Sequence, residues 1–263
     1  MKIAIIGAGN LGLSIATGIL HSGGASSMYL TRRHLDALKE YEAYDTVTIT
    51  SDNRKAVSES DILIFAVQPA HFAAILDSVQ DLLHENHVLI STITGFSLAS
   101  MEAIVGSQRY IIRAMPNTAI SVGRSMTCLC SNETGKKRID LAEAIFNRMG
   151  NSMVIPESQM QAATVICASG IAFWMRLIRA TTQGAIQLGF DAREAQELAM
   201  HTCRGAAELL HSPRLGAVYT SPIQRCRETA EIVAAPHRRT PEVLTDVQEV
   251  DFGAWQGRTL ASL

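Results

Sequence analysis

Three glycines near the N-terminus have the spacing of a dinucleotide cradle. Gly7, Gly9 and Gly12 satisfy G-x-G-x-x-G directly after the apolar run 2–6, at the start of a helical pattern. In this motif the first glycine permits a tight turn, the second lets the backbone approach a pyrophosphate, and the third lets helix and strand pack closely. The helix N-terminus adds free N–H groups and a partial positive charge. A glycine-rich structural turn is the alternative, but the strand-turn-helix context favours a dinucleotide.

Two arginines bear on which dinucleotide binds. The expected second strand, 27–31, ends at Thr31, and Arg32 and Arg33 follow where an NAD-selective site usually has Asp or Glu. A guanidinium group suits a 2′-phosphate, which an acid would repel. NADPH is therefore the expected cofactor and NADH the alternative. The competing interpretation is that both arginines are only solvated cations at the start of a helix.

An alternation of strands and helices must hold these residues in place. Further strands are expected at 46–50, within 61–69, at 87–95 and at 110–116, and one of the intervening helices begins near Asp52. Such alternation predicts an α/β fold with a Rossmann-like doubly wound parallel sheet. Ligands of these sheets bind beyond the carboxyl ends of the strands, which selects 66–69, 92–95 and 115–118.

Over residues 1 to about 210 the sequence resembles the pyrroline-5-carboxylate reductases, in "IGAGNLGLSIATGIL", "SDNRKAVSESDILIFAVQP", "STITGFSL" and "RAMPNTAISVGRSMT". The resemblance implies the last step of proline biosynthesis. In that reaction NAD(P)H delivers hydride to the C=N carbon of 1-pyrroline-5-carboxylate and gives L-proline. Reducing an electrophilic iminium needs positioning more than acid–base catalysis. Accordingly, no Ser/His/Asp triad or carboxylate pair is apparent in the first domain.

The resemblance also implies site residues. The nicotinamide is expected near Met115, Pro116 and Asn117. Ser169 and Gly170 match a turn that frames the substrate site in the family, although small residues that permit tight helix packing explain them equally well. Asn117, Ser169 and Gly170 are thus the candidates at the reacting centre. Besides Gly12 and Arg33, the expected cofactor contacts are Ile6, Gly7, Ala8, Gly9, Asn10, Leu11, Thr31, Arg32, Asn53, Ala66, Val67, Gln68, Pro69, Thr92, Ile93, Thr94, Met115 and Pro116. Gln68 stands where the family commonly has Lys, which removes one cation near the cofactor.

The second half of the chain reads as helical. Residues 157–190 form one long pattern that is apolar around much of its circumference, so it must be buried in a partner subunit or a helical domain. Asp191 then begins another helix, with Glu194 three residues on in a capping-box arrangement. The resemblance makes 156–211 an all-helical dimerisation segment after a cofactor domain at 1–155, and it implies a homodimer or a higher homo-oligomer.

The C-terminal residues depart from this family. No Pro-Gly-Gly-Thr-Thr loop, which would hold the substrate carboxylate, follows residue 210. Instead, "LGAVYTSPIQRCRETAEIV" and "VQEVDFGAWQGRTL" resemble the histidine phosphatase (phosphoglycerate-mutase-like) superfamily, where Arg225 and Glu249 match a phosphate-pocket arginine and an acid. No Arg-His-Gly nucleophile motif is present, so phosphatase activity is not expected. We therefore expect an atypical, foreign tail at 212–263.

Composition and charge bear on the partners and the cellular location to be expected. The net charge of −2 gives no reason to expect nucleic-acid binding. The five cysteines form no Cys-x-x-Cys pair, so we expect no metal site and no disulfide framework, and a cytoplasmic location. The N-terminus does not read as a signal peptide, and no charge-free run reaches about 18 apolar residues, so no membrane partner is expected. Two alternatives to a working reductase stay open: an NADP(H)-binding protein with impaired turnover, and a related imine or keto-acid reductase.

Overall fold

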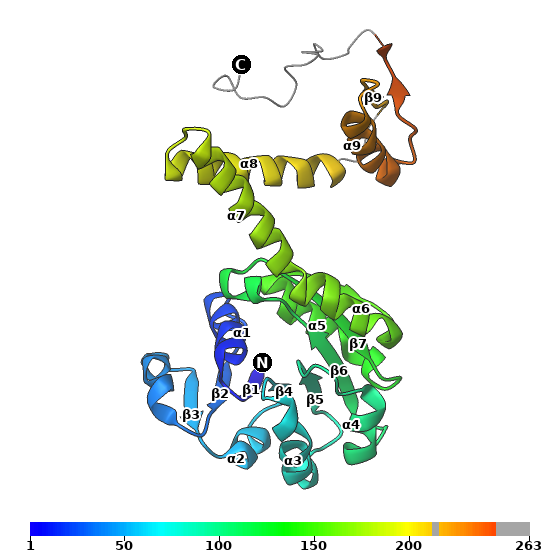
Figure 1. The fold of residues 1–263 in the computed structure, drawn as a ribbon. Coiled ribbons are helices and arrows are strands. Elements are labelled where there is room, and N and C mark those ends of the chain that lie inside the picture. The colour runs from blue at the N-terminus through cyan, green and yellow to red at the C-terminus, as the bar shows by residue number, and fades with distance from the viewer. Residues whose placement is uncertain (212–215, 246–263) are drawn as a thin grey trace. The chain divides into compact units, whose positions relative to one another are not determined.

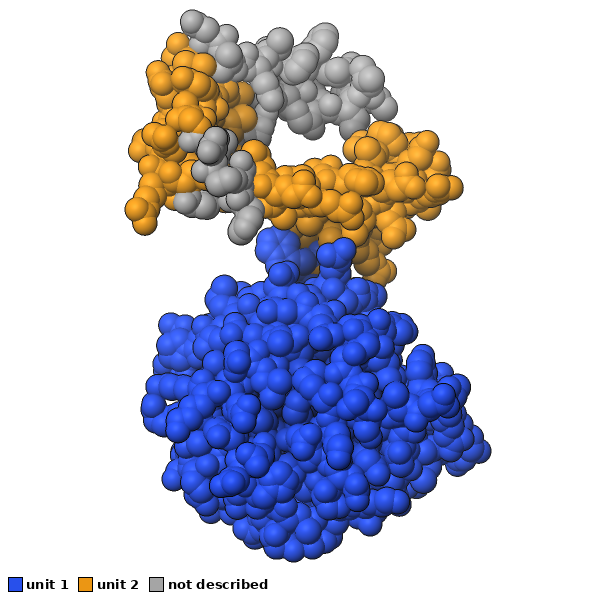
Figure 2. Space-filling model, turned by 180° about the vertical axis from the view of Figure 1, so that it is seen from behind, with its two compact units in different colours: residues 1–174 blue, residues 175–263 orange. Residues whose placement is uncertain are grey.

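The structure, a computed structural model, describes residues 1–211 and 216–245. The chain divides into two compact units, residues 1–174 and 175–263, which are coloured separately in Figure 2. The predicted boundaries at 155/156 and 211/212 rest on sequence resemblance and stay predictions.

An eight-stranded sheet in the order β3-β2-β1-β4-β5-β6-β7-β8 lies at the centre of the first unit (Figure 1). The strands β1 to β6 are mutually parallel, and their order 3-2-1-4-5-6 is that of a Rossmann fold, as the alternation predicts. The sheet reverses direction of winding between β1 and β4, which is where such folds bind ligands. The strands are β1 (Lys2–Ile6), β2 (Ser27–Thr31), β3 (Val47–Thr50), β4 (Ile62–Phe65), β5 (Val88–Ser91), β6 (Tyr110–Met115), β7 (Ser125–Ser131) and β8 (Gly150–Val154).

The end of the sheet departs from the expected all-parallel pattern. β7 runs antiparallel to β6, and β8 then pairs in parallel with β7. Only the short 3-10 turn η3 (Thr118–Val122) joins β6 to β7, and so short a connection cannot carry the crossover that a parallel pair needs. The chain after Met115 therefore turns back as a strand.

Helices cover both faces of the sheet. One core combines Ile3 and Ile5 of β1 with residues of α1 and α5, and the other combines Ala4 and Ile6 with residues of α2, α3, α4 and α6. This alternation within β1 is what a strand buried on both faces requires. The α-helices of this layer are α1 (Asn10–His21), α2 (Asn53–Ser58), α3 (Pro69–Val79), α4 (Leu98–Val105), α5 (Ile139–Phe146) and α6 (Met160–Ala163). Short 3-10 turns accompany them at η1 (Leu35–Ala43), η2 (Gln80–Leu82), η4 (Gly135–Arg138), η5 (Asn147–Met149) and η6 (Glu157–Gln159).

Helix ends follow local chemistry. The carboxylate of Asp52 accepts hydrogen bonds from the backbone N–H groups of Arg54 and Lys55, so the predicted cap is confirmed. Asp191 likewise accepts from the N–H groups of Arg193 and Glu194, ahead of α8 (Ala192–His211). These bonds, first that from Glu194, lower the pKa of Asp191.

The long helical stretch after residue 157 is not one regular helix. A π-helical segment, η7 (Thr164–Ser169), separates α6 from α7 (Ile171–Gln187). The apolar side chains of α7 are largely uncovered in the single chain. Phe173 is 66% exposed and Trp174 is 60% exposed. The sequence pattern predicts burial of this face, and the described residues do not provide it.

By length and composition, one described helical stretch, Glu157–Gln187, could cross a membrane. This finding does not decide the prediction of no membrane partner, which stays a prediction. The sequence criterion asked for a charge-free run, which Arg176 and Arg179 interrupt. Only 11% of the most apolar window of this stretch is buried within the chain.

The second unit contains a small β-α-β motif after α8. The strands β9 (Tyr219–Thr220) and β10 (Glu242–Val243) pair in parallel, and α9 (Gln224–Ala234) with η8 (Ala235–His237) connects them.

His87 is a fully buried imidazole in the first unit. Its Nε2 lies 2.8 Å from the carbonyl oxygen of Ser60, its Nδ1 accepts the N–H of His84, and the two imidazole rings stack 3.5 Å apart. This pattern fixes the neutral Nε2–H tautomer. Burial first, and then the charge of His84, lower the pKa of His87 below its ordinary 6.5.

The free energy of unfolding is expected to fall as the pH drops below about 6.5, because the unfolded chain then binds a proton that folded His87 resists. The contribution is complete above the ordinary pKa and is lost on acidification, with a slope of at most about 1.4 kcal/mol per pH unit. Urea unfolding between pH 7.5 and 5.5 measures it. The variant H87Q should show a flatter profile, whereas H21Q, at an exposed histidine, should match the wild type. Equal slopes for all three chains would contradict this account.

Candidate functional site

A pocket of about 610 Å³ lies at the carboxyl ends of the first four strands. Its walls come from the turn after β1, the segments after β2 and β3, the loop after β4, and α3. The lining residues are Gly7, Ala8, Gly9, Thr31, Arg32, Arg33, His34, Ser51, Asn53, Ala66, Val67, Gln68, His71, Ala74, Ile75 and Ser78. We call this the cofactor pocket, because half of the residues expected to touch a dinucleotide line it.

The three glycines of the motif have different reasons to be glycine. Gly7 has φ +96°, and a Cβ there would collide with Cγ1 of Val67. A Cβ on Gly12 would collide with the carbonyl oxygen of Gly7, so these two residues let α1 pack against the turn. A Cβ on Gly9, in contrast, meets no described atom within 4 Å. The packing of the chain does not demand glycine there, whereas close approach of a pyrophosphate does.

The cofactor pocket favours anions. Arg32, Arg33, His34 and His71 line it, and none of its described lining residues is an Asp or Glu. Arg32 is held toward the turn, since its Nη1 donates to the carbonyl oxygen of Ala8 at 3.2 Å. Gly9, the N-cap residue of α1, has no side chain to cap the helix, which leaves the first N–H groups of α1 free for a phosphate. These residues therefore fit the phosphates of a dinucleotide.

A second pocket, of about 420 Å³, lies beside the first turn of α1 and the segment after β6. We call it the reaction pocket, because it holds the segment where nicotinamide is expected. Its lining residues are Asn10, Leu11, Ser14, Pro116, Asn117, Thr118, Ile120, Ser121 and Ala168. Gly9 lines the cofactor pocket and Asn10 lines this one, so the glycine turn adjoins both.

Asn117 fixes the floor of the reaction pocket. Its Oδ1 accepts the N–H of Ala119 at 3.1 Å, and its Nδ2 donates to the carbonyl oxygen of Cys167 at 3.2 Å. Its own N–H donates to Oγ of Ser125 at 3.2 Å. The side chain therefore joins the end of β6 to the π-helical segment.

The other two candidates at the reacting centre lie next to the reaction pocket rather than in its lining. Ala168 lines the pocket, while Ser169 is exposed and Gly170 is buried. A Cβ on Gly170 would collide with the carbonyl oxygen of Ile166, so close packing requires glycine there.

Several predicted cofactor residues line neither pocket. Thr92 is buried and its Oγ1 donates to the carbonyl oxygen of Phe65 at 2.9 Å, which ties β5 to β4. The predicted residues outside both linings are Ile6, Gly12, Pro69, Thr92, Ile93, Thr94 and Met115. The lining residues that sequence reasoning missed are Ser14, His34, Ser51, His71, Ala74, Ile75, Ser78, Ile120, Ser121 and Ala168. His71 and Ser78 carried a usable signal, because they lie about two turns apart, and so on one face, of the helix that begins at Pro69.

A partly buried ion pair connects β6 to the helical segment. Oε1 of Glu157 accepts from Nη1 of Arg113 and from the N–H of Leu98, each at 2.7 Å. Arg113 is only 8% exposed. One carboxylate thus joins β6, the start of α4 and the start of the helical segment.

The sheet has the strand order of a Rossmann fold, and the cofactor pocket lies at its switch point, between the ends of β1 and β4. Residues 2–95 match the family model described as NADP oxidoreductase, coenzyme F420-dependent, and residues 157–249 match that of pyrroline-5-carboxylate reductase dimerisation. The second match extends past residue 210, where the motif resemblance stops.

Individual relatives agree with these matches. Pyrroline-5-carboxylate reductase 2 of Dictyostelium discoideum is 36% identical over 80% of this chain and 76% of its own. Reductase 1 of the same organism is 38% identical over 79% of this chain, which spans only 40% of that protein's length. The structure of the Coxiella burnetii pyrroline-5-carboxylate reductase is 30% identical, covers 81% of each chain and superposes with a TM-score of 0.75. The chain belongs to the pyrroline-5-carboxylate reductase family.

Thiols near the reaction pocket are poor nucleophiles. Burial, and then the neighbouring Cys167 with its Sγ 3.9 Å away, raise the pKa of Cys128 to about 11. Burial likewise raises the pKa of Cys130 to about 11.

Iodoacetamide should therefore alkylate Cys128 and Cys130 in the folded chain at pH 8 at least about a hundredfold more slowly than an ordinary thiol, because the thiolate is the reactive form. Mass spectrometry of timed samples measures the rates, and the same reaction in urea supplies the unhindered reference. Folded and unfolded rates within a factor of two would contradict the raised pKa values.

Proposed function

We propose that the chain reduces 1-pyrroline-5-carboxylate to L-proline with NADPH. The observation that carries the proposal is the adjacency of the two pockets at the glycine turn. One is lined by arginines and histidines, and the other by Pro116 and Asn117. The relatives that are 31–38% identical to this chain are named pyrroline-5-carboxylate reductases.

The chain's residues act by positioning. When bound, the dinucleotide would supply the hydride, and Arg32, Arg33 and the free N–H groups of α1 would hold its phosphates. Asn117 holds the floor of the reaction pocket in place through its bonds to Ala119 and Cys167. Because an iminium is already electrophilic, no group with a poised pKa is required at this floor.

Assembly completes the proposal. The uncovered apolar face of α7 and the match to a dimerisation model support a homodimer or a higher homo-oligomer. Cytoplasmic location and the absence of nucleic-acid and membrane partners stay predictions. So do the roles assigned to Asn117, Ser169 and Gly170.

The tail is the point on which the alternatives rest. We propose that 212–263 is a foreign segment of histidine-phosphatase type, supported by its two sequence stretches and by the β9-α9-β10 motif. The side chain of Arg225, and Glu249 with its stretch 247–260, lie outside the described residues. The sequence contains no Pro-Gly-Gly-Thr-Thr loop, so a cofactor-binding chain with impaired turnover, or a related imine or keto-acid reductase, is the competing function.

Replacing Arg32 and Arg33 together with Ala should raise the dissociation constant of NADPH at least about tenfold, because a 2′-phosphate loses its cationic partners. The dissociation constant of NADH should stay within twofold. Fluorescence titration of both cofactors measures this. K137A, at an exposed lysine outside both pockets, should change neither. Equal losses for NADPH and NADH would instead make the arginines general anchors.

Oxidation of NADPH followed by absorbance should show turnover with 1-pyrroline-5-carboxylate. Removing 213–263 should leave NADPH affinity within twofold, because the described residues that line the two pockets precede the tail. Tight NADPH binding without turnover would favour the alternative of a cofactor-binding chain with impaired turnover. Turnover only on other imines or keto acids would favour the related reductase.

A further inference from the structure

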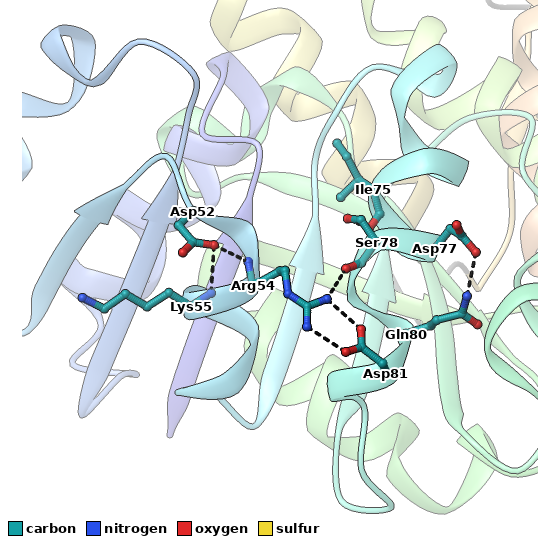
Figure 3. Close-up of polar contacts among 8 residues, drawn as sticks. All are labelled: Asp52, Arg54, Lys55, Ile75, Asp77, Ser78, Gln80 and Asp81. Carbon is teal, nitrogen blue, oxygen red and sulfur yellow. Dashed lines mark hydrogen bonds and ion pairs between the residues drawn. The ribbon is translucent and has the colours of Figure 1, made fainter.

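One polar contact outside the cofactor pocket joins two of its walls. Figure 3 shows the guanidinium group of Arg54, on α2, pointing at the carboxylate of Asp81 and the carbonyl oxygen of Ser78. Nη1 and Nη2 each donate to one oxygen of Asp81 at 2.7 Å, and Nη1 also donates to Ser78 at 2.6 Å. We call this three-bond contact the Arg54 clamp.

The clamp spans residues that themselves line the cofactor pocket. Asn53, immediately before Arg54, lines it from α2, and Ser78 lines it from the end of α3. Ile75, on the same pocket wall, is held to Ser78 because the Ser78 hydroxyl donates to its carbonyl oxygen at 2.7 Å. The contact therefore fixes the spacing between the wall that carries Asn53 and the wall that carries Ile75 and Ser78.

The geometry distinguishes this contact from an ordinary surface ion pair. Exposed pairs usually contribute little, because two long side chains must be ordered and water screens their charges. Here Nη1 and Nη2 of the guanidinium group each donate to one carboxylate oxygen, which makes a fork. The third bond, to the backbone carbonyl of Ser78, holds α3 itself as well as the Asp81 side chain. The start of α2 is also fixed, since Asp52 accepts the N–H of Arg54 at 2.9 Å. The hydrogen bond from Arg54 lowers the pKa of Asp81, so the pair stays charged at neutral pH.

We propose that Arg54 and Asp81 are positioning residues for the cofactor: without touching it, they set the width of the pocket between α2 and α3. The proposal rests on the proposed function only in taking this pocket as the dinucleotide site. Because Arg32 and Arg33 line the same pocket, the part of the ligand that depends on the clamp is the nucleotide that carries the 2′-phosphate.

The test compares R54Q, R54K, D81N and the double variant R54Q/D81N by titration with NADPH, adenosine 2′,5′-bisphosphate and nicotinamide mononucleotide. R54Q and D81N should each raise the dissociation constants of NADPH and of adenosine 2′,5′-bisphosphate by about three- to fivefold. R54K should lose less affinity for these two ligands, because lysine keeps the positive charge but cannot make the two parallel bonds to the carboxylate. The double variant should be no worse than either single variant, because both remove the same contact.

The matched control is K136Q, which breaks an exposed ion pair of similar length, 2.6 Å to Glu133, away from both pockets. It should leave all three affinities unchanged. The melting temperature and the binding of nicotinamide mononucleotide should also be unchanged in every clamp variant, which separates positioning from general destabilisation.

Affinities for NADPH within twofold of wild type in R54Q would overturn the proposal, as would equal losses for both fragments. A wild-type chain that binds NADPH without reducing 1-pyrroline-5-carboxylate would reject the proposed function and leave this comparison intact. A wild-type chain that binds no NADPH would reject both.

Discussion

The close approach of β1, α1 and β4 at Gly7 is the contact on which the rest of the site depends. Gly7 adopts a positive φ beneath Val67, and Gly12 packs against the Gly7 carbonyl, so neither position has room for a side chain. This crowding brings the start of α1 to the carboxyl ends of β1 and β4. The cofactor pocket and the reaction pocket both begin at that point, because Gly9 lines one and Asn10 lines the other. Anion recognition and the expected place of hydride transfer are thus set by one turn.

The opposite side of the reaction pocket is held by polar contacts instead of by close packing. Asn117 connects the end of β6 to the carbonyl of Cys167, and Glu157 connects Arg113 of β6 to the start of α4. Both contacts join the sheet to the helical segment. The π-helical segment that receives the Asn117 bond has wider turns than an α-helix, and such segments are frequent at functional sites. Ala168, within this π-helical segment, lines the reaction pocket.

Much of the fold could be predicted from the sequence, and the reasons are local. The strands Lys2–Ile6 and Ser27–Thr31 lie where their apolar runs place them, and Asp52 caps its helix as its residue type predicts. β7 was not predictable in the same way, because its direction follows from a short connection and its burial does not alternate. The site divides similarly. The glycine motif and the two arginines can be recognised from residue type and spacing alone. The Arg54 clamp and the Glu157 contact pair residues 27 and 44 positions apart, so only the folded chain brings them together.

The uncovered face of α7 has a further consequence for how the folded state responds to dilution. Phe173 and Trp174 expose most of their surface in the single chain. A second copy that covers these side chains would stabilise the folded state only while it is bound. That part of the free energy of unfolding would therefore depend on protein concentration, by mass action. Its melting temperature is then a property of a solution at a stated protein concentration, and a diluted sample unfolds at a lower temperature with every internal contact of the chain unchanged.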